Sequence, residues 1–436
     1  MSLQTPVKIR MLQRKLYRKA KEEPHYRFYL LYDKISREDI LAQAYALAKT
    51  KGGAAGVDGQ TFSEIETGGR EKWLAEIRNE LREKRYQPQP VRRVMIPKPQ
   101  GGQRALGIPT IRDRVVQTAA KLLLEPILEA DMEPSAYGYG PRRSALGAVE
   151  EVQRLLRKGY TEVVDADLSQ YFATIPHREL QQCVARRIVD RDVLHLIQMW
   201  LKVPVEERNE KGNRCLTGGR DSTCGTPQGG VISPLLANLY MNRFLKYWRQ
   251  SGRGEVFQAQ VINYADDFVI LSRGHAAEAM EWTRRVMAQL GLTIKEAKTS
   301  IRNARQEEFD FLGYPFGRLR HFRGGYWYFG ARPSQNSISR LRSKVGTLLR
   351  RRNLQPWPDV RDQLNRILRG WRAYFCRGMC TKAVRVIDHY VPERVRRFLV
   401  QRHKIPGGGT KRFSDSEIFG ALGVLRLRYL DRPAPL

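Results

Sequence analysis

The sequence of 436 residues contains few cysteines. The five that it has lie at positions 183, 215, 224, 376 and 380, an odd and scattered set that does not predict a disulfide framework. Cys376 and Cys380 are four residues apart, but no second pair supplies the four ligands of a structural zinc site. We therefore expect a cytoplasmic protein without disulfides or structural zinc.

Long apolar runs are absent as well. No stretch approaches the roughly 18 residues of a membrane-spanning helix. The first residues do not read as a secretory signal, and Glu22, Glu23 and Asp33 argue against a targeting peptide. We expect no membrane partner. The hydrophobic fraction of 42% is nevertheless sufficient for a large core, and the length allows two or three domains.

Negative charge is scarce relative to positive charge. The chain has 77 Lys and Arg against 45 Asp and Glu, a formal net charge of +32. Residues 331–436 alone hold 24 Lys and Arg against 7 Asp and Glu, which gives 24 − 7 = +17. Such an excess predicts a polyanionic partner, with nucleic acid as the leading candidate.

Short strand patterns alternate with longer helical ones along the first three quarters of the chain, which predicts an α+β domain. We expect two short strands within 92–110, strands at 161–168 and 292–301, and hairpins around 204–223 and 258–272. Helices are expected at 112–132, 144–158, 177–202, 231–249 and 276–290, in the N-terminal segment, and repeatedly after 332 in a small basic domain.

Two acidic segments interrupt apolar strands. Asp266 and Asp267 lie within "VINYADDFVIL", and Asp165 and Asp167 follow two valines in "EVVDADL". Neighbouring buried carboxylates repel each other unless a cation is shared between them. Magnesium prefers oxygen ligands of this kind, completed by substrate phosphates. The alternative is a solvated type I′ turn and a capped strand end.

Seven stretches occur in series: "IPKPQGGQRALGIPTIRDRVVQ", "VVDADLSQYF", "GTPQGGVISPLLANLYMN", "YADD", "LGLTIKEAKTSI", "FLGYPF" and "LNRILRGWRAYF". In these the chain resembles the reverse transcriptases encoded by bacterial and organellar group II introns, also called maturases. The resemblance covers about residues 52–403. The chain departs from the family's usual Arg-Pro-Gly-Arg-Ser-Ala-His-Asp-Ala in "GPRRSALGA", and we expect no C-terminal His-Asn-His nuclease.

The resemblance implies an α+β right-hand polymerase, with fingers and palm followed by a helical thumb, the maturase X domain. The expected segments are a basic helical extension at 1–33, fingers and palm at 34–330, the thumb at 331–405 and a basic tail at 406–436. The "FLGYPF" stretch matches the primer grip, the element that holds the growing strand.

The resemblance also implies the catalytic groups. Asp167, Asp266 and Asp267 would bind two Mg²⁺ ions, with Mn²⁺ as an alternative, and Lys298 would protonate the leaving pyrophosphate. Two such ions activate the attacking hydroxyl and stabilise the leaving group. For Lys298 the alternative is a solvated lysine at a strand end.

Further positions match nucleotide- and strand-binding residues of the family. Lys98 and Arg104 would grip the triphosphate, and Phe172 would exclude a 2′-hydroxyl. The loop around Gln228 would support the template and the new base pair, together with Pro227, Gly229 and Gly230. The alternatives are surface positions for Lys98 and Arg104, core packing for Phe172, and an ordinary loop for the glycines.

The expected function is RNA-directed DNA polymerisation, with binding of intron RNA to assist splicing and retrohoming. The partners are an RNA template, a DNA or RNA primer, target DNA and dNTPs, in an RNP or at the nucleoid. In the thumb, Arg366, Arg369 and Arg372 would contact RNA phosphates. The alternatives are a domesticated relative in DNA repair or phage defence, an RNA-dependent RNA polymerase, and a non-catalytic splicing factor.

Overall fold

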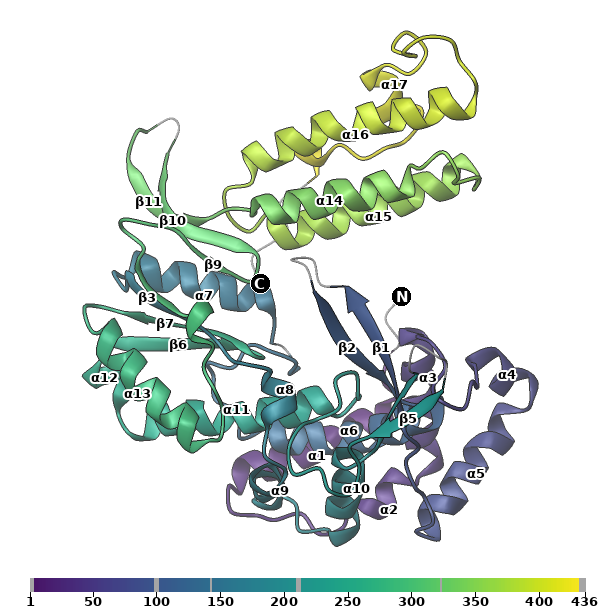
Figure 1. The fold of residues 1–436 in the computed structure, drawn as a ribbon, viewed down its shortest axis with the longest axis vertical. Coiled ribbons are helices and arrows are strands. Elements are labelled where there is room, and N and C mark those ends of the chain that lie inside the picture. The colour runs from purple at the N-terminus through teal and green to yellow at the C-terminus, as the bar shows by residue number, and fades with distance from the viewer. Residues whose placement is uncertain (1–3, 98–101, 142, 209–212, 322–323, 431–436) are drawn as a thin grey trace.

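The computed structural model describes residues 4–97, 102–141, 143–208, 213–321 and 324–430 (Figure 1). Its centre is a four-stranded sheet, called here the palm sheet, in the order β6-β7-β3-β8 with every neighbouring pair antiparallel. The strands are β3 (Glu162–Asp167), β6 (Ala259–Tyr264), β7 (Asp267–Ser272) and β8 (Ser300–Asn303).

The central strand β7 is buried on both faces, which explains its nearly continuous apolar sequence. Val164 and Ile270 belong to a core that they share with helices, whereas the alternate residues Val163 and Leu271 belong to a second core. The helices around the sheet are α7 (Ala145–Arg157), α8 (Tyr171–Thr174), α11 (Ser233–Gln250), α12 (Arg253–Val256) and α13 (Ala276–Gln289). A three-stranded sheet in the order β11-β10-β9 adjoins it, formed by β9 (Phe309–Phe311), β10 (Tyr314–Arg320) and β11 (Trp327–Ala331).

The prediction of a strand over 292–301 is wrong for most of that range. The segment contains a short 3₁₀ helix, η1 (Glu296–Lys298), and only residues from Ser300 onward belong to β8. Within the segment, the amide of Lys298 donates to the Lys295 carbonyl at 2.9 Å, a local bond that replaces a sheet ladder. The physical reason is the polar, unbranched run Lys295–Lys298, which has little tendency to form a strand.

The fingers surround the largest core. They contain α1 (Val7–Glu22), α2 (Tyr32–Ile35), α3 (Glu38–Lys51), α4 (Phe62–Thr67), α5 (Arg70–Arg82), α6 (Ile111–Glu129), α9 (His177–Ala185) and α10 (Arg191–Leu201). A second four-stranded sheet has the order β2-β1-β4-β5, with β1 (Val91–Pro97), β2 (Gln103–Ile108), β4 (Val205–Arg208) and β5 (Arg214–Thr217). Ile9 and Leu16 of α1 are buried in the same core as residues of α6, so α1 packs on the fingers. The division into four segments stays a prediction.

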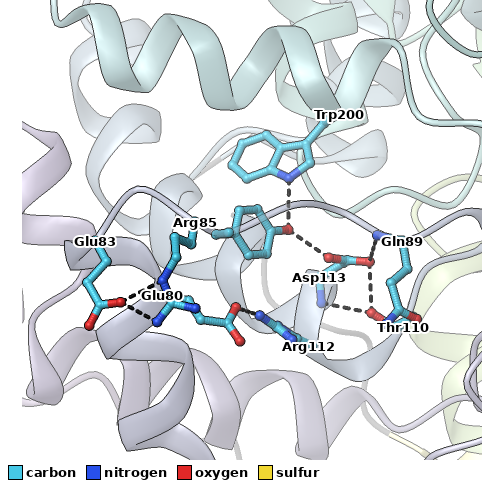
Figure 2. A network of polar contacts seen from close by, with 9 residues as sticks. Glu80, Glu83, Arg85, Gln89, Thr110, Arg112, Asp113 and Trp200 are labelled. Carbon is cyan, nitrogen blue, oxygen red and sulfur yellow. Dashed lines mark hydrogen bonds and ion pairs between the residues drawn. The ribbon is translucent and has the colours of Figure 1, made fainter.

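A buried polar network fixes the chain just before β1 (Figure 2). Asp113 on α6 accepts hydrogen bonds from the Tyr86 hydroxyl at 2.7 Å and from the Gln89 amide at 3.1 Å. Thr110 donates to the same carboxylate, and the Trp200 indole of α10 donates to the Tyr86 oxygen. Burial raises the pKa of Asp113. The network joins α6, α10 and the start of the β1–β2 hairpin into one rigid unit.

The thumb is a helical layer at the top of Figure 1, where α14, α15 and α16 lie side by side. It comprises α14 (Gln335–Leu348), α15 (Trp357–Phe375), α16 (Thr381–Arg402), α17 (Asp415–Phe419) and η2 (Leu427–Tyr429). Asp388 on α16 accepts hydrogen bonds from the amides of Leu427 and Arg428, so the C-terminal segment packs on the thumb. Among the residues that the structure describes, no helix is long and apolar enough to cross a membrane.

Candidate active site

The two acidic segments meet at one end of the palm sheet. The register of β3 against β7 places Asp167 directly opposite Asp267, and Asp266 lies in the two-residue turn between β6 and β7. Residues opposite each other in an antiparallel pair have Cα atoms about 4.5–5.5 Å apart. The sheet therefore brings together the three carboxylates that the sequence singled out. Their role as metal ligands stays a prediction.

The electrostatics show that these carboxylates crowd one another. Burial raises the pKa of Asp267 to about 7, and the charges of Asp165, Asp266 and Asp167 add to the rise. Burial also raises the pKa of Asp165 to about 6, although the charge of Arg302 opposes it. Full ionisation of this cluster therefore requires additional positive charge.

Lys298 supplies one such charge. Its Nζ lies 3.4 Å from Oδ2 of Asp167, and its charge lowers the pKa of Asp267 against the other effects. The 3₁₀ turn of η1 and the bond from the Lys295 amide to the Asp167 carbonyl, 2.8 Å long, hold this segment against the end of β3. The structure thus places Lys298 beside the carboxylates, while its part in proton transfer stays a prediction.

The turn that carries Asp266 is supported by a segment that sequence reasoning did not single out. Asn263 exchanges backbone hydrogen bonds with Ser135 and Tyr137, at 2.9 and 2.7 Å, and its side-chain amide donates to the Ala265 carbonyl. Gly138 lies so close that a Cβ there would be 2.7 Å from the Ala265 nitrogen. Gly138 in "SAYGYG" was the available signal for this contact, because close backbone approach often requires glycine.

Ala265 itself has a φ of +61°, whereas Asp266 has a negative φ. A type I′ turn requires positive φ at both central residues, so this hairpin does not have the turn that was the alternative explanation of the adjacent aspartates. The Tyr139 ring lies beside Tyr264, with centroids 6.3 Å apart. Burial raises the pKa of Tyr139, and the charge of Asp266 adds to the rise, which places the phenol near the carboxylates.

The fingers hairpin contacts the loop that contains the paired glycines. The Gly107 amide of β2 donates to the Gln228 carbonyl at 2.5 Å, and Arg104 Nε donates to the Gln228 side-chain oxygen at 3.3 Å. Gly229 has a φ of +111°, and a Cβ there would collide with the Gly107 carbonyl. The structure thus brings the predicted residues Arg104, Gln228 and Gly229 into one contact.

The remaining part of this loop leads into α11. Pro227 accepts hydrogen bonds from the Gly230 amide at 3.0 Å and from the Ser233 hydroxyl at 2.9 Å. The side-chain oxygen of Gln117 on α6, a residue that sequence reasoning did not single out, accepts a hydrogen bond from the Val231 amide at 2.8 Å. These bonds fix the loop to the fingers core. The predicted residue Lys98 lies outside the described residues.

Phe172 lies on α8, directly after the loop that follows Asp167. Its side chain is 7% exposed, and its carbonyl accepts from the Thr226 amide at 2.6 Å. Its ring contacts Tyr171, with centroids 5.7 Å apart, and the Tyr171 hydroxyl donates to the Ala237 carbonyl. The ring is therefore buried against Tyr171, and its backbone is tied to Thr226, just before Pro227. Its action on the sugar of a nucleotide stays a prediction.

The three thumb arginines separate into two kinds. Arg366 and Arg369 are exposed on α15. Arg372 is only 7% exposed, and its guanidinium donates to the Leu430 carbonyl at 2.5 Å. The prediction that Arg372 contacts RNA phosphates is therefore wrong for this conformation, because its side chain is buried and donates to the C-terminal segment. The sequence of α15 alone could not show what covers the last turn of the helix.

The carboxylate cluster fits a divalent cation in its chemistry. Its donors are hard oxygens, and their mutual repulsion is what a shared cation would relieve. Within the described part of the chain, no group of three His, Cys, Asp or Glu side chains has a ready geometry for a metal ion. Mg²⁺ commonly takes only one or two protein carboxylates and completes its shell with substrate phosphates and water. The site thus fits ions that arrive with a nucleotide.

Comparison with known proteins decides the family. Residues 96–316 match the family described as reverse transcriptase (RNA-dependent DNA polymerase), and residues 338–414 match the group II intron, maturase-specific domain. This chain belongs to the reverse transcriptase family. The resemblance to group II intron reverse transcriptases and the α+β polymerase fold with a thumb are confirmed. The function implied by these two domains, RNA-directed DNA polymerisation and assistance of intron splicing, is confirmed at the same level.

Several individual proteins are similar to this chain. Protein YkfC of Escherichia coli (strain K12) is 34% identical over 346 residues, which are 71% of this chain and 88% of that protein. The group II intron-encoded protein LtrA of Lactococcus lactis subsp. cremoris is 32% identical over 223 residues, 50% of this chain and only 35% of LtrA. A chain of a partial Cas6-RT-Cas1–Cas2 complex is similar with a TM-score of 0.36 and 25% identity, covering 59% of this chain and 42% of that one.

Proposed function

We propose that this chain is a catalytically competent reverse transcriptase in which Asp167, Asp266 and Asp267 hold two Mg²⁺ ions. The observation that carries the proposal is the register of the palm sheet, which sets Asp167 opposite Asp267 beside the turn with Asp266. A non-catalytic splicing factor has no need of three crowded carboxylates, which cost stability without a cation.

The bound ions would lower the pKa of the attacking hydroxyl and neutralise the leaving pyrophosphate. The chain's own residues do the rest. Asp167, Asp266 and Asp267 would hold the ions that bind the reacting phosphate, and Lys298, 3.4 Å from Asp167, donates a proton to the leaving group. Arg104 neutralises the triphosphate from the fingers, where Gln228 holds its guanidinium at 3.3 Å. Phe172 excludes the 2′-hydroxyl of a ribonucleotide.

The nucleic-acid partners follow from the family. The exposed Arg366 and Arg369 bind phosphates of a group II intron RNA, and the protein acts within that RNP to assist splicing and retrohoming at a target DNA. Pro227, Gly229 and Gly230 place the template strand against the fingers hairpin.

Primer extension on poly(rA) with oligo(dT) tests the proposal. Asp266→Ala should abolish incorporation, a loss of about a thousand-fold or more, because a metal ligand is removed. Asp33→Ala removes an exposed carboxylate on α2 and should leave the rate unchanged. Incorporation that survives Asp266→Ala contradicts the metal assignment, and a wild-type protein that binds RNA without any incorporation supports the non-catalytic alternative.

A further inference from the structure

A basic site lies where the palm meets the thumb, apart from the acidic cluster. A cavity of about 800 Å³, called here the hinge cavity, opens between α7, β11 and the connection from α15 to α16. None of the candidate active-site residues lines it. Arg157, in the cavity wall, lies shortly before Glu162, the first residue of β3. Asp167 is the last residue of that strand, roughly 17 Å from Glu162 along its length. The hinge cavity is therefore a separate feature. Its polar and charged walls include Arg157, His321, Tyr328, Arg377, Lys382 and Arg385.

The charge of the hinge cavity is of one sign. Four cationic side chains line it and no carboxylate does. Arg377 forms an ion pair with Glu150 at 3.7 Å. Arg157, Lys382 and Arg385 are exposed and have no hydrogen-bond or ion-pair partner within the residues that the structure describes. Three uncompensated like charges around one cavity favour a polyanionic ligand.

The first turn of α16 adds backbone donors to the same wall. This helix of 22 residues begins at Thr381, and Cys380 at its N-cap makes no side-chain capping bond. Its first turn contains no acidic residue. The leading N–H groups and the positive end of the helix dipole are therefore free for an anion such as a phosphate.

Aromatic rings stand beside the cations. Tyr326, directly before β11, is 58% exposed. The His321 ring stacks on Tyr326 with centroids 4.7 Å apart, and Tyr328, which lines the cavity, lies 6.3 Å from Tyr326. Exposed rings next to a basic groove suit the bases of an unpaired strand, whereas paired bases are not available for such stacking.

The cavity is built on fixed contacts. The Met379 amide donates to the Ala331 carbonyl at 2.8 Å, and Gly378 lies so close to that carbonyl that a Cβ would collide with it. The connection between α15 and α16 is thus fastened to the end of β11. Because palm and thumb both contribute walls, a ligand here would bridge the two domains.

We propose that the hinge cavity binds an unpaired polynucleotide strand outside the polymerase cleft. Phosphates lie against Arg157, Lys382, Arg385 and the start of α16, and bases stack on Tyr326 and its neighbours. The proposal rests on the assignment of the chain as a nucleic-acid polymerase, but its site and its test are independent of catalysis.

The test uses the full chain with its cleft filled by an excess of an unlabelled, fully paired rA/dT duplex, in EDTA. Binding of a fluorescein-labelled oligo(C) or oligo(dC) of about 15 nucleotides, which pairs with neither strand of that duplex, is followed by anisotropy across a salt series. Joint Arg157→Gln, Lys382→Gln and Arg385→Gln should weaken binding about ten-fold and reduce the salt slope by about 2. Comparing the two probes shows whether the cavity prefers RNA or DNA. Weaker binding of either probe by the triple variant supports the proposed site.

A matched control changes Lys72, Arg82 and Arg191 to Gln, three exposed cations of the fingers, and should leave affinity and slope as in the wild type. Tyr326→Ala should lower affinity about five-fold without a change of slope, because it removes stacking and no charge. Equal affinity and slope in the triple variant and the control overturn the proposal, as does equally tight binding of a labelled duplex. Because the assay needs no incorporation, a failed primer extension leaves its result interpretable.

Discussion

At the scale of single residues, the crowded aspartates control both the chemistry and the stability of the palm. In the folded protein the pKa of Asp267 is raised to about 7 and that of Asp165 to about 6, by burial first and then by neighbouring charges. An unfolded aspartate titrates near 4. Between about pH 4 and pH 7 the folded, metal-free protein therefore holds protons that the unfolded chain has released.

The sign of the resulting pH dependence follows from linkage. Where the folded state binds more protons, the free energy of unfolding decreases as the pH rises, so metal-free protein should lose stability between about pH 4 and pH 7. Urea denaturation in EDTA at pH 5 and pH 8 measures this. Asp267→Asn should reduce the loss, and Asp33→Asn, which changes an exposed carboxylate, should not. Mg²⁺ should stabilise the wild type more at pH 8 than at pH 5. An equal effect at both values would contradict a site made of ionised carboxylates.

Phe172 determines sugar selectivity if its ring faces the incoming nucleotide. Phe172→Ala should reduce discrimination against ribonucleotides by about ten-fold or more, because the group that collides with a 2′-hydroxyl is removed. The ratio of kcat/KM for dTTP and UTP on a poly(rA) template measures this. The same change removes a buried ring, so it should also lower stability by roughly 3 kcal/mol. Leu180→Ala, a buried truncation in the same core, should lower stability without altering the ratio.

At the scale of elements, the catalytic turn depends on the segment 135–139 packed against it. Gly138→Ala should push the Ala265 backbone away, since its Cβ would lie 2.7 Å from the Ala265 nitrogen. We expect kcat for primer extension to fall about ten-fold, because Asp266 moves with the turn. Gly147→Ala in the first turn of α7 has only ordinary contacts and should keep kcat. Unchanged activity of Gly138→Ala would show that the turn does not need this support.

At the scale of the whole molecule, the thumb has exposed arginines that we expect to bind RNA and a buried arginine that holds the C-terminal segment. Joint Arg366→Gln and Arg369→Gln should weaken RNA binding and lower the salt slope by about 1 to 2, because both side chains are exposed. Arg372→Gln should leave the slope unchanged and lower the melting temperature, because its guanidinium holds the Leu430 carbonyl. Filter binding of intron RNA across a salt series, with thermal unfolding in parallel, separates the two. A slope change in Arg372→Gln alone would reverse this assignment.

The sequence by itself determined the chemistry of the site and most of its elements. β-branched runs ending in aspartates predict strands with acidic ends, and paired glycines predict a close backbone approach, since both are local properties of the residues. Only the tertiary structure decided what covers a given face. Local sequence could not show that the Leu430 carbonyl accepts a hydrogen bond from Arg372, or that Asn263 and Gly138 support the turn that carries Asp266. Nor could it show that the residues around Lys298 turn instead of extending β8. Those outcomes depend on partners distant in the chain, which local sequence does not specify.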